Sequence, residues 1–164
     1  MASSPDAIFI AAGGASATVP HTELKRLGYK GQIDHTHAAA NQAFLRMGGK
    51  ALDGAVLPVG PVLVWDQLPE SHPSKRKARD FSKAYERGMG PDSVSVFGTY
   101  LYDAMQLIAA STPNALSSAR PGSVEFRKAL RAALESSGRV VGAHGIYEFS
   151  PESHVSSEEH IESW

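Results

Sequence analysis

Two short segments of the chain carry residue types that could bind a ligand. The first, Asp34 to His37, holds two histidines and a carboxylate. Residues two apart lie on the same face of a strand, so this spacing is compatible with zinc or copper binding by His35 and His37. Spacing alone identifies no third ligand of a suitable type. The segment is therefore a weak metal signal, and we predict no metal site.

The second segment, Gly13 to Ser16, follows a short apolar run. It lacks the G-x-G-x-x-G pattern and the Lys-Ser/Thr pair of nucleotide-binding loops. A tight turn from a strand into a helix explains the two glycines without a phosphate. The backbone N–H groups of Ala15 and Ser16, near a helix start, could still bind the carboxylate of a ligand.

The elements that would position these segments alternate between apolar runs and helical patterns. The run at 7–12 predicts a strand buried on both faces, and a helix is expected from about Pro20 to Leu27, closed by Gly28. An extended piece at 32–34, a short helix at 41–47 and a second buried strand at 54–59 follow. Several prolines then mark a loop over 60–71.

Three amphipathic helices are predicted in the second half of the chain. The first begins after Pro73 and ends at Gly88, the second ends before Pro113, and the third is closed by Gly138. Their apolar residues recur at spacings of three and four, and we expect them in the core: Ala78, Phe81, Ala84 and Tyr85; Phe97, Leu101, Met105 and Ile108; and Phe126, Leu130, Ala133 and Leu134. Short extended pieces are expected at 140–141 and 145–149.

Composition excludes several classes of protein. The 16 Lys and Arg residues against 17 Asp and Glu give a net charge of −1, so nothing electrostatic favours nucleic acid as a partner. No apolar run approaches the roughly 18–20 residues of a membrane span, which argues against membrane insertion. The chain has no cysteine, hence no disulfide. The start, MASSPDAIFIAAGG, lacks a basic region, and we predict no signal peptide.

Strands alternating with helices predict an α/β fold with a Rossmann-like parallel sheet flanked by helices. Beyond this pattern, four collinear segments carry a resemblance to a known family. They are PDAIFIAAGGASATVPHTELKRLGYKG, THAAANQAFLRMGGKALDGAVLPVGPVLVWDQLP, FSKAYERGMGPDSVSVFGTYLYDAMQLIAA and FRKALRAALES with VVGAHGIYEFSPESH. In these segments the sequence resembles the C-terminal lobe of a type I periplasmic solute-binding protein of the branched-chain amino-acid ABC importers.

The resemblance implies a receptor rather than an enzyme, with no cofactor. Residues 1–154 would form one lobe of the periplasmic-binding-protein-like I fold, the N-terminal lobe being absent, and 155–164 would be a divergent, loose tail. The family holds a small ligand, such as an amino acid or related carboxylate, in a cleft between two lobes, and its closed form meets an ABC permease in the periplasm. Self-association through the exposed lobe face is a further expectation.

The resemblance also implies the ligand contacts. The loop Gly14, Ala15 and Ser16 matches one contact, the loop Thr36 and His37 a second, and Ser95 lies near a third. Some members carry an aromatic residue at the place of Ala15, and some carry a carboxylate for the ligand's ammonium group at the place of His37. A neutral histidine accepts a hydrogen bond but supplies no negative charge.

These observations leave three hypotheses. In the first, the chain is a truncated substrate-binding component for branched-chain amino acids or related small carboxylates. In the second, it is a remnant of such a receptor that binds nothing. The third, and weakest, is a small metal-binding protein centred on His35 and His37. A chain with half the clamp should bind ligand far more weakly than a complete receptor.

Overall fold

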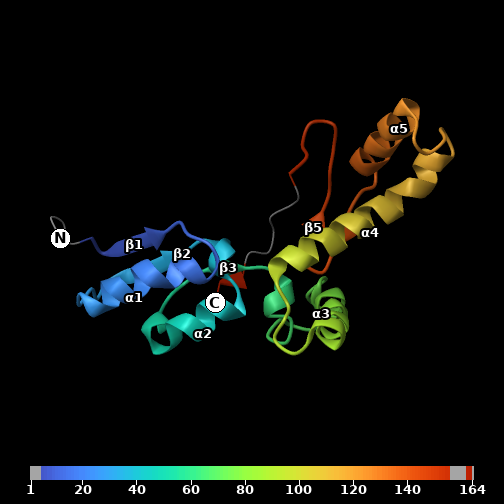
Figure 1. The fold of residues 1–164 in the computed structure, drawn as a ribbon. Coiled ribbons are helices and arrows are strands. Elements are labelled where there is room, and N and C mark those ends of the chain that lie inside the picture. The colour runs from blue at the N-terminus through green and yellow to red at the C-terminus, as the bar shows by residue number, and fades with distance from the viewer. Residues whose placement is uncertain (1–4, 156–161, 164) are drawn as a thin grey trace.

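The computed structural model describes residues 5–155 and 162–163. Figure 1 shows them as two units. The first unit contains the early strands with α1 and α2, and the second contains α3, α4, α5 and the late strands β4 and β5. Separate clusters of buried apolar side chains lie in the two units, one set around Phe44 and Ile33 and another around Phe81.

The first unit is built on a parallel strand pair. Strand β1 (Ala7–Ile10) runs parallel to β2 (Gln32–His35), with α1 (Thr18–Arg26) as the crossover between them. After α2 (Gln42–Gly48) the chain makes one parallel bridge, from Val56 to Asp34. It then forms β3 (Pro58–Val59), which pairs antiparallel with β6 (Glu162–Ser163). The predicted α/β fold with a parallel sheet and flanking helices is confirmed.

Local sequence signals explain where these two helices begin and end. Helix α1 stops before Gly28, whose φ of 83° lies in the left-handed region that glycine adopts without strain. Helix α2 begins after Asn41, whose side chain accepts a hydrogen bond from the Phe44 N–H at 2.9 Å. Both helices lie within two residues of their predicted bounds.

The expectation that the first strand is buried on both faces is wrong. In β1 only Ile10 is buried, and the Phe9 side chain is 65% exposed. Ile10 packs with Tyr29 and Ile33 on the side of the sheet that α1 covers. Among the described residues, nothing covers the side that bears Phe9, so a run that is apolar throughout has one open face.

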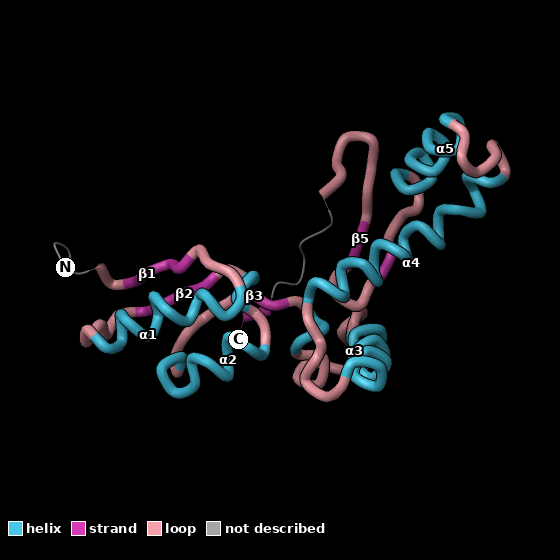
Figure 2. Tube along the Cα trace, in the orientation of Figure 1, coloured by secondary structure: helices cyan, strands magenta, loops and turns pink. Residues whose placement is uncertain are grey.

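The second unit is mainly helical, and Figure 2 shows long helices joined by loops with very short strands. It comprises α3 (Lys75–Met89), α4 (Val96–Leu116) and α5 (Val124–Glu135), followed by the antiparallel pair β4 (Val140–Val141) and β5 (Ile146–Tyr147). Helix α5 lies along the C-terminal part of α4. The predicted burial of Phe81 in α3 and of Ala133 in α5 is confirmed.

Helix α4 departs from prediction in two ways. Its apolar stripe, expected in the core, is exposed at all four positions: Phe97, Leu101, Met105 and Ile108. The buried face instead carries Val96, Thr99, Asp103, Leu107, Ser111 and Ala115. The helix also continues through Pro113 to Leu116. Pro113 is itself exposed, so water can satisfy the carbonyl that loses its hydrogen bond there.

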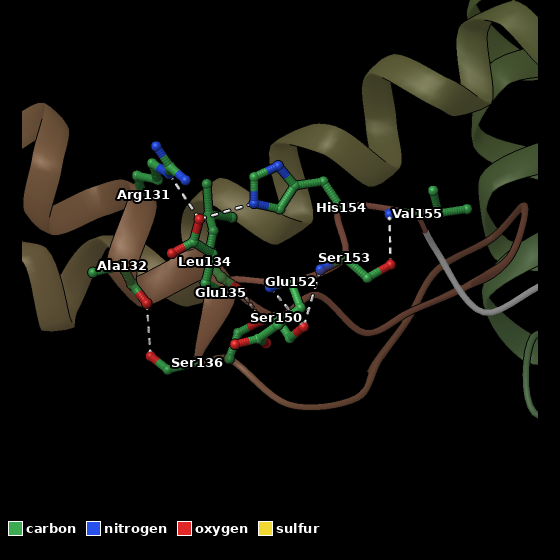
Figure 3. Close-up of polar contacts among 11 residues, drawn as sticks. Arg131, Ala132, Leu134, Glu135, Ser136, Ser150, Glu152, Ser153, His154 and Val155 are labelled. Atoms are coloured by element: carbon green, nitrogen blue, oxygen red, sulfur yellow. Dashed lines mark hydrogen bonds and ion pairs between the residues drawn. The ribbon is translucent and has the colours of Figure 1, made fainter.

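The chain after β5 is tied back to α5, as Figure 3 shows. Glu135 accepts hydrogen bonds from Arg131 at 2.7 Å and from His154 at 2.9 Å. The hydrogen bond from Arg131, and to a smaller extent that from His154, holds the pKa of the Glu135 carboxyl below its usual value. Of the predicted tail 155–164, residues 156–161 and 164 lie outside the described residues.

Candidate ligand-binding site

The loop after β1 has the geometry of a tight strand-to-helix turn. Gly14 has a φ of 59°, which a residue with a Cβ rarely adopts, and a short 3₁₀ turn over Gly14–Ala17 leads directly into α1. The Ser16 hydroxyl donates to the Gly13 carbonyl at 2.7 Å. Ala15 and Ser16 are both accessible to solvent. The predicted contact residues thus lie at the surface, beside the N-terminal end of a helix.

The second predicted loop lies directly beside the first. Thr36 follows β2, and its hydroxyl donates to the Ala12 carbonyl at 2.9 Å. A Cβ built on Gly13 would lie 3.3 Å from the Ala38 side chain, so the two loops are in van der Waals contact. His37 is exposed next to them. The structure therefore brings five of the six predicted residues together at the carboxyl ends of β1 and β2.

Two aromatic rings of the second unit approach His37, and the sequence reasoning assigned no role to either. The Tyr100 ring of α4 lies 6.3 Å from the His37 ring, centroid to centroid, in an edge-on arrangement. The His144 ring, between β4 and β5, lies 4.6 Å from that of Tyr100. Tyr100 adjoins the apolar stripe of α4 in sequence, but only the fold places it opposite His37.

Asp103 fixes the position of His144. Its carboxylate is 1% exposed and accepts three hydrogen bonds, from the N–H groups of Ala143 and His144 at 2.7 and 2.8 Å and from the Tyr147 hydroxyl at 2.9 Å. Burial raises the pKa of Tyr147, and the Asp103 charge raises it further. Asp103 is therefore a positioning residue: it holds the β4–β5 turn against α4 and so holds His144 beside Tyr100.

Burial also keeps the His144 imidazole neutral. It lowers the pKa of His144, an effect that the Asp103 charge partly offsets. The ring packs over Gly60, where any Cβ would collide with it at 2.1 Å. Its buried Nδ1 has no hydrogen-bond partner in the structure. A neutral imidazole and a phenol hydroxyl can both donate and accept hydrogen bonds.

The described hydrogen bonds do not join the sixth predicted residue, Ser95, to the other five. It precedes α4, and its carbonyl accepts a hydrogen bond from the Thr99 hydroxyl at 3.1 Å, within the same helix. The described cavity of about 350 Å³ is formed by α2 and the segment that follows it. None of the six predicted residues lines that cavity: its walls are Phe44, Leu45, Gly49, Leu52, Asp53, Gly54, Ala55 and Leu57.

The structure contradicts the placement of His35 and His37 on one strand face. Strand β2 ends at His35, which is buried, whereas His37 is exposed. His35 stacks on His21 instead, with Nε2 of His35 2.8 Å from Nδ1 of His21. Nε2 of His21 lies 2.8 Å from the Ala51 carbonyl. In the described residues no group of three potential metal ligands occurs.

These contacts fix the tautomers of the histidine pair. A carbonyl only accepts, so His21 donates from Nε2 to Ala51 and its neutral Nδ1 accepts from Nε2–H of His35. Nδ1 of His35 is then a buried lone pair without a partner. Burial is the main cause that lowers the pKa of both rings. The pair joins α1 to the end of β2, and thereby links the elements that carry the two candidate loops.

Comparison with known proteins decides the family. The model of the periplasmic binding protein family matches residues 1–159. The chain belongs to this family. A comparison with curated protein sequences gives no match. In the described part of the chain, no helix has the length and apolarity needed to cross a membrane.

Solved structures confirm the type I fold. An extracellular ligand-binding receptor from Rhodopseudomonas palustris HaA2 is 34% identical, with a TM-score of 0.91 over 98% of this chain and 45% of that one. A putative branched-chain amino acid ABC transporter from Rhodospirillum rubrum is 24% identical, with a TM-score of 0.67 over 97% of this chain and 41% of that one. A leucine binding protein from Thermotoga maritima MSB8 is 18% identical, with a TM-score of 0.66 over 98% and 44%. This periplasmic binding protein thus spans less than half the length of these structures.

Proposed function

We propose that this chain supplies ligand-contacting walls of a periplasmic receptor for a small carboxylate, such as a branched-chain amino acid or a related compound, that serves an ABC importer. One observation carries the proposal: loops 13–16 and 36–37 meet at the carboxyl ends of parallel strands, opposite the Tyr100 and His144 rings. Open α/β sheets bind ligands at this edge. Family membership supports a binding role rather than an enzymatic one.

The ligand carboxylate would lie at Gly14–Ser16. The first N–H groups of a helical segment lack intrahelical partners and point toward an incoming anion. Thr36 donates its hydroxyl proton to Ala12, so its oxygen is left to accept. His37 would order the second polar group of the ligand, and Tyr100 and His144 would pack against its body.

The charge of the site narrows the ligand class. The buried carboxylate of the cluster, Asp103, is already engaged by three donors. His37 stands where some family members carry a carboxylate. With the described contact residues offering no free carboxylate, a ligand without an ammonium group fits this site better than an α-amino acid does. We therefore place related small carboxylates ahead of the branched-chain amino acids.

The remaining assignments follow from the family. Residues 1–154 are proposed as a receptor lobe. This lobe includes both units, which meet between β3 and α3, because the candidate contacts come from both of them. The proposed location is the periplasm, with an ABC permease as partner. The alternative, a remnant that binds nothing, is favoured by the open apolar faces of β1 and α4. Such faces would also promote self-association.

A ligand-dependent melting scan tests the proposal. The purified chain is heated with leucine-like and aromatic carboxylates, each with and without an α-amino group. A ligand at about a hundred times its Kd stabilises the folded state by about 2.7 kcal/mol. We expect a carboxylate to raise Tm and His37→Ala to remove the shift.

The matched control is His154→Ala, which alters an exposed histidine held by Glu135 away from the site. It should keep the full shift in Tm. A cooperative melt that no carboxylate changes would favour the remnant. Micromolar or tighter binding of a small amino acid by the isolated monomer would contradict the expectation that this chain binds more weakly than a complete receptor.

A further inference from the structure

His21 and His35 form a pair of titratable side chains in the interior of the first unit. The two residues are 0% and 1% exposed, and their rings stack with an angle of 10° between the ring planes. The Phe44 ring of α2 meets His35 edge-on, at 4.8 Å between centroids. Neither imidazole belongs to the proposed ligand contacts, so their titration has no role in the site described above.

The hydrogen bonds of the pair leave one place for an added proton. His21 donates to the Ala51 carbonyl and His35 donates to His21, so Nδ1 of His35 is the free basic nitrogen. A proton that instead arrives at Nδ1 of His21 forces Nε2 of His35 to accept, and the proton on His35 must then move to Nδ1. Either route creates an N–H at Nδ1 of His35, a buried atom without a hydrogen-bond partner. A buried cation with an unpaired donor is strongly unfavourable.

The surroundings of the pair do not compensate for such a charge. From α2 and the turn at 49–52 the pair meets the phenylalanine ring and the carbonyl already named, which carry no charge. Lys25, on α1, lowers the pKa of His21, whereas Asp34, on β2, raises the pKa of His35. Burial is the largest cause at both rings and lowers both pKa values.

We propose that this pair is a proton-operated switch at the junction of loops 13–16 and 36–37: the junction is closed while both rings are neutral, and protonation below about pH 6.5 opens it. The position of the pair gives the switch its effect. His21 lies on α1, which follows the first loop, and His35 is the last residue of β2, directly before the second. Loss of the hydrogen bond between the rings therefore separates the elements that carry the two loops.

The switch does not depend on the ligand. One consequence does rest on the proposed function: a ligand held by both loops should be released at acid pH. A chain that binds no carboxylate would contradict the proposed function and leave the switch as it is, because the switch is measured without any ligand.

Amide hydrogen exchange over a pH series tests the switch. The reporters are the N–H groups of His35 and Thr36, which donate to the Val56 carbonyl at 2.8 Å and the Ile10 carbonyl at 3.4 Å. Division by the intrinsic exchange rate gives the opening constant at each pH. From pH 7 to pH 5 this constant should rise about 600-fold, because opening lets both rings bind a proton at the ordinary pKa. Amides of α3 near Phe81 report unfolding of the second unit and should stay more protected throughout.

His35→Gln is the matched variant, because its side-chain amide still donates a hydrogen bond but binds no proton in this pH range. The rise should fall to about 25-fold, the value for one histidine. His154→Gln alters an exposed histidine and should keep the full rise. An opening constant that is flat from pH 7 to pH 5, or that equals the constant of the α3 amides, would overturn the proposal.

Nitrogen-15 spectra of the wild-type rings add a measurement that does not require the variant to fold. At pH 7.5 both His21 and His35 should be neutral, with the proton on Nε2. A proton on Nδ1 of His35 at this pH would also overturn the proposal, because the site that the switch protonates would already be occupied.

Discussion

Helices α3 and α4 differ in whether the apolar stripe that their sequence predicts is buried. In α3 the apolar residues Ala78 and Phe81 are buried, and the basic residues Arg76 and Lys83 are exposed. In α4 the larger apolar side chains face outward, and the buried face includes Thr99, Asp103 and Ser111. Both helices have the same apolar spacing, so periodicity identifies a helix but not the neighbour that its apolar side meets.

The difference reflects what each helix packs against. Phe81 lies in a cluster with Val62, Val96 and Ala143, which come from the segment before α3, from α4 and from the β4–β5 turn. The inner face of α4 meets the β4–β5 turn, where Asp103 accepts two backbone N–H groups. A helix that packs against neighbours on two sides needs apolar groups, or polar groups with hydrogen-bond partners, on both sides. Among the described residues, the neighbours of α4 cover one of its faces and leave its apolar stripe open.

The largest expected effect tests the polar side of α4. Asp103→Ala should destabilise the fold by about 3–5 kcal/mol, because three donors lose their acceptor in a buried site. Chemical denaturation of the chain measures the change. Ser111→Ala is the control, since this buried hydroxyl on the same face has no hydrogen-bond partner. Equal losses of stability in Asp103→Ala and Ser111→Ala would contradict the positioning role of Asp103.

The next test concerns the core side of α3. Phe81→Ala should cost about 3–4 kcal/mol of unfolding free energy, because a buried aromatic ring is replaced by a cavity. The same denaturation experiment provides the value. A cost below about 1 kcal/mol would mean that the Phe81 cluster does not form the core of the second unit.

A pH titration of stability extends the comparison to the first unit. Burial lowers the pKa of His21 and His35 below 6.5, so the unfolded chain binds more protons than the folded one at acid pH. The stabilisation is complete above about pH 6.5 and decreases as the pH falls below it. The slope should be about 1.4 kcal/mol per pH unit for each histidine that stays neutral in the folded state.

Melting curves from pH 8 to pH 5 measure this slope. His35→Phe should reduce it by about a third, because one of the three buried neutral rings, His21, His35 and His144, is lost. His154→Ala alters an exposed histidine and should leave the contribution of the buried pair unchanged. A stability that is flat between pH 7 and pH 5 would rule out the tautomers assigned to the pair.

The smallest effect is expected on the open side of α4. Leu101→Ala should change the stability of the isolated chain by no more than about 0.5 kcal/mol, since the side chain is already in water. Denaturation of the chain measures the change, and a large cost would mean that the stripe is buried.

Much of the first unit could be predicted from the sequence. The run at 7–10, the cap at Gly28 and the Asn41 side chain specify the strand and both helix boundaries through local interactions. The loops at Gly14–Ser16 and Thr36–His37 lie together as expected, because parallel strands place their carboxyl ends at one edge of the sheet. Tyr100 and His144 could not be predicted, because their approach to His37 depends on long-range packing.

The sequence by itself determined which segments are helix or strand, the family, and the two loops that follow β1 and β2. These features depend on residues a few positions apart and on glycine and asparagine at turns. Only the tertiary structure decided which apolar faces have partners. It also decided that His35 pairs with His21 rather than with His37, and that Asp103 is fully hydrogen-bonded. Burial depends on neighbours that are distant in sequence. A periodic apolar pattern therefore predicts a helix with an apolar face, but not whether another element covers that face.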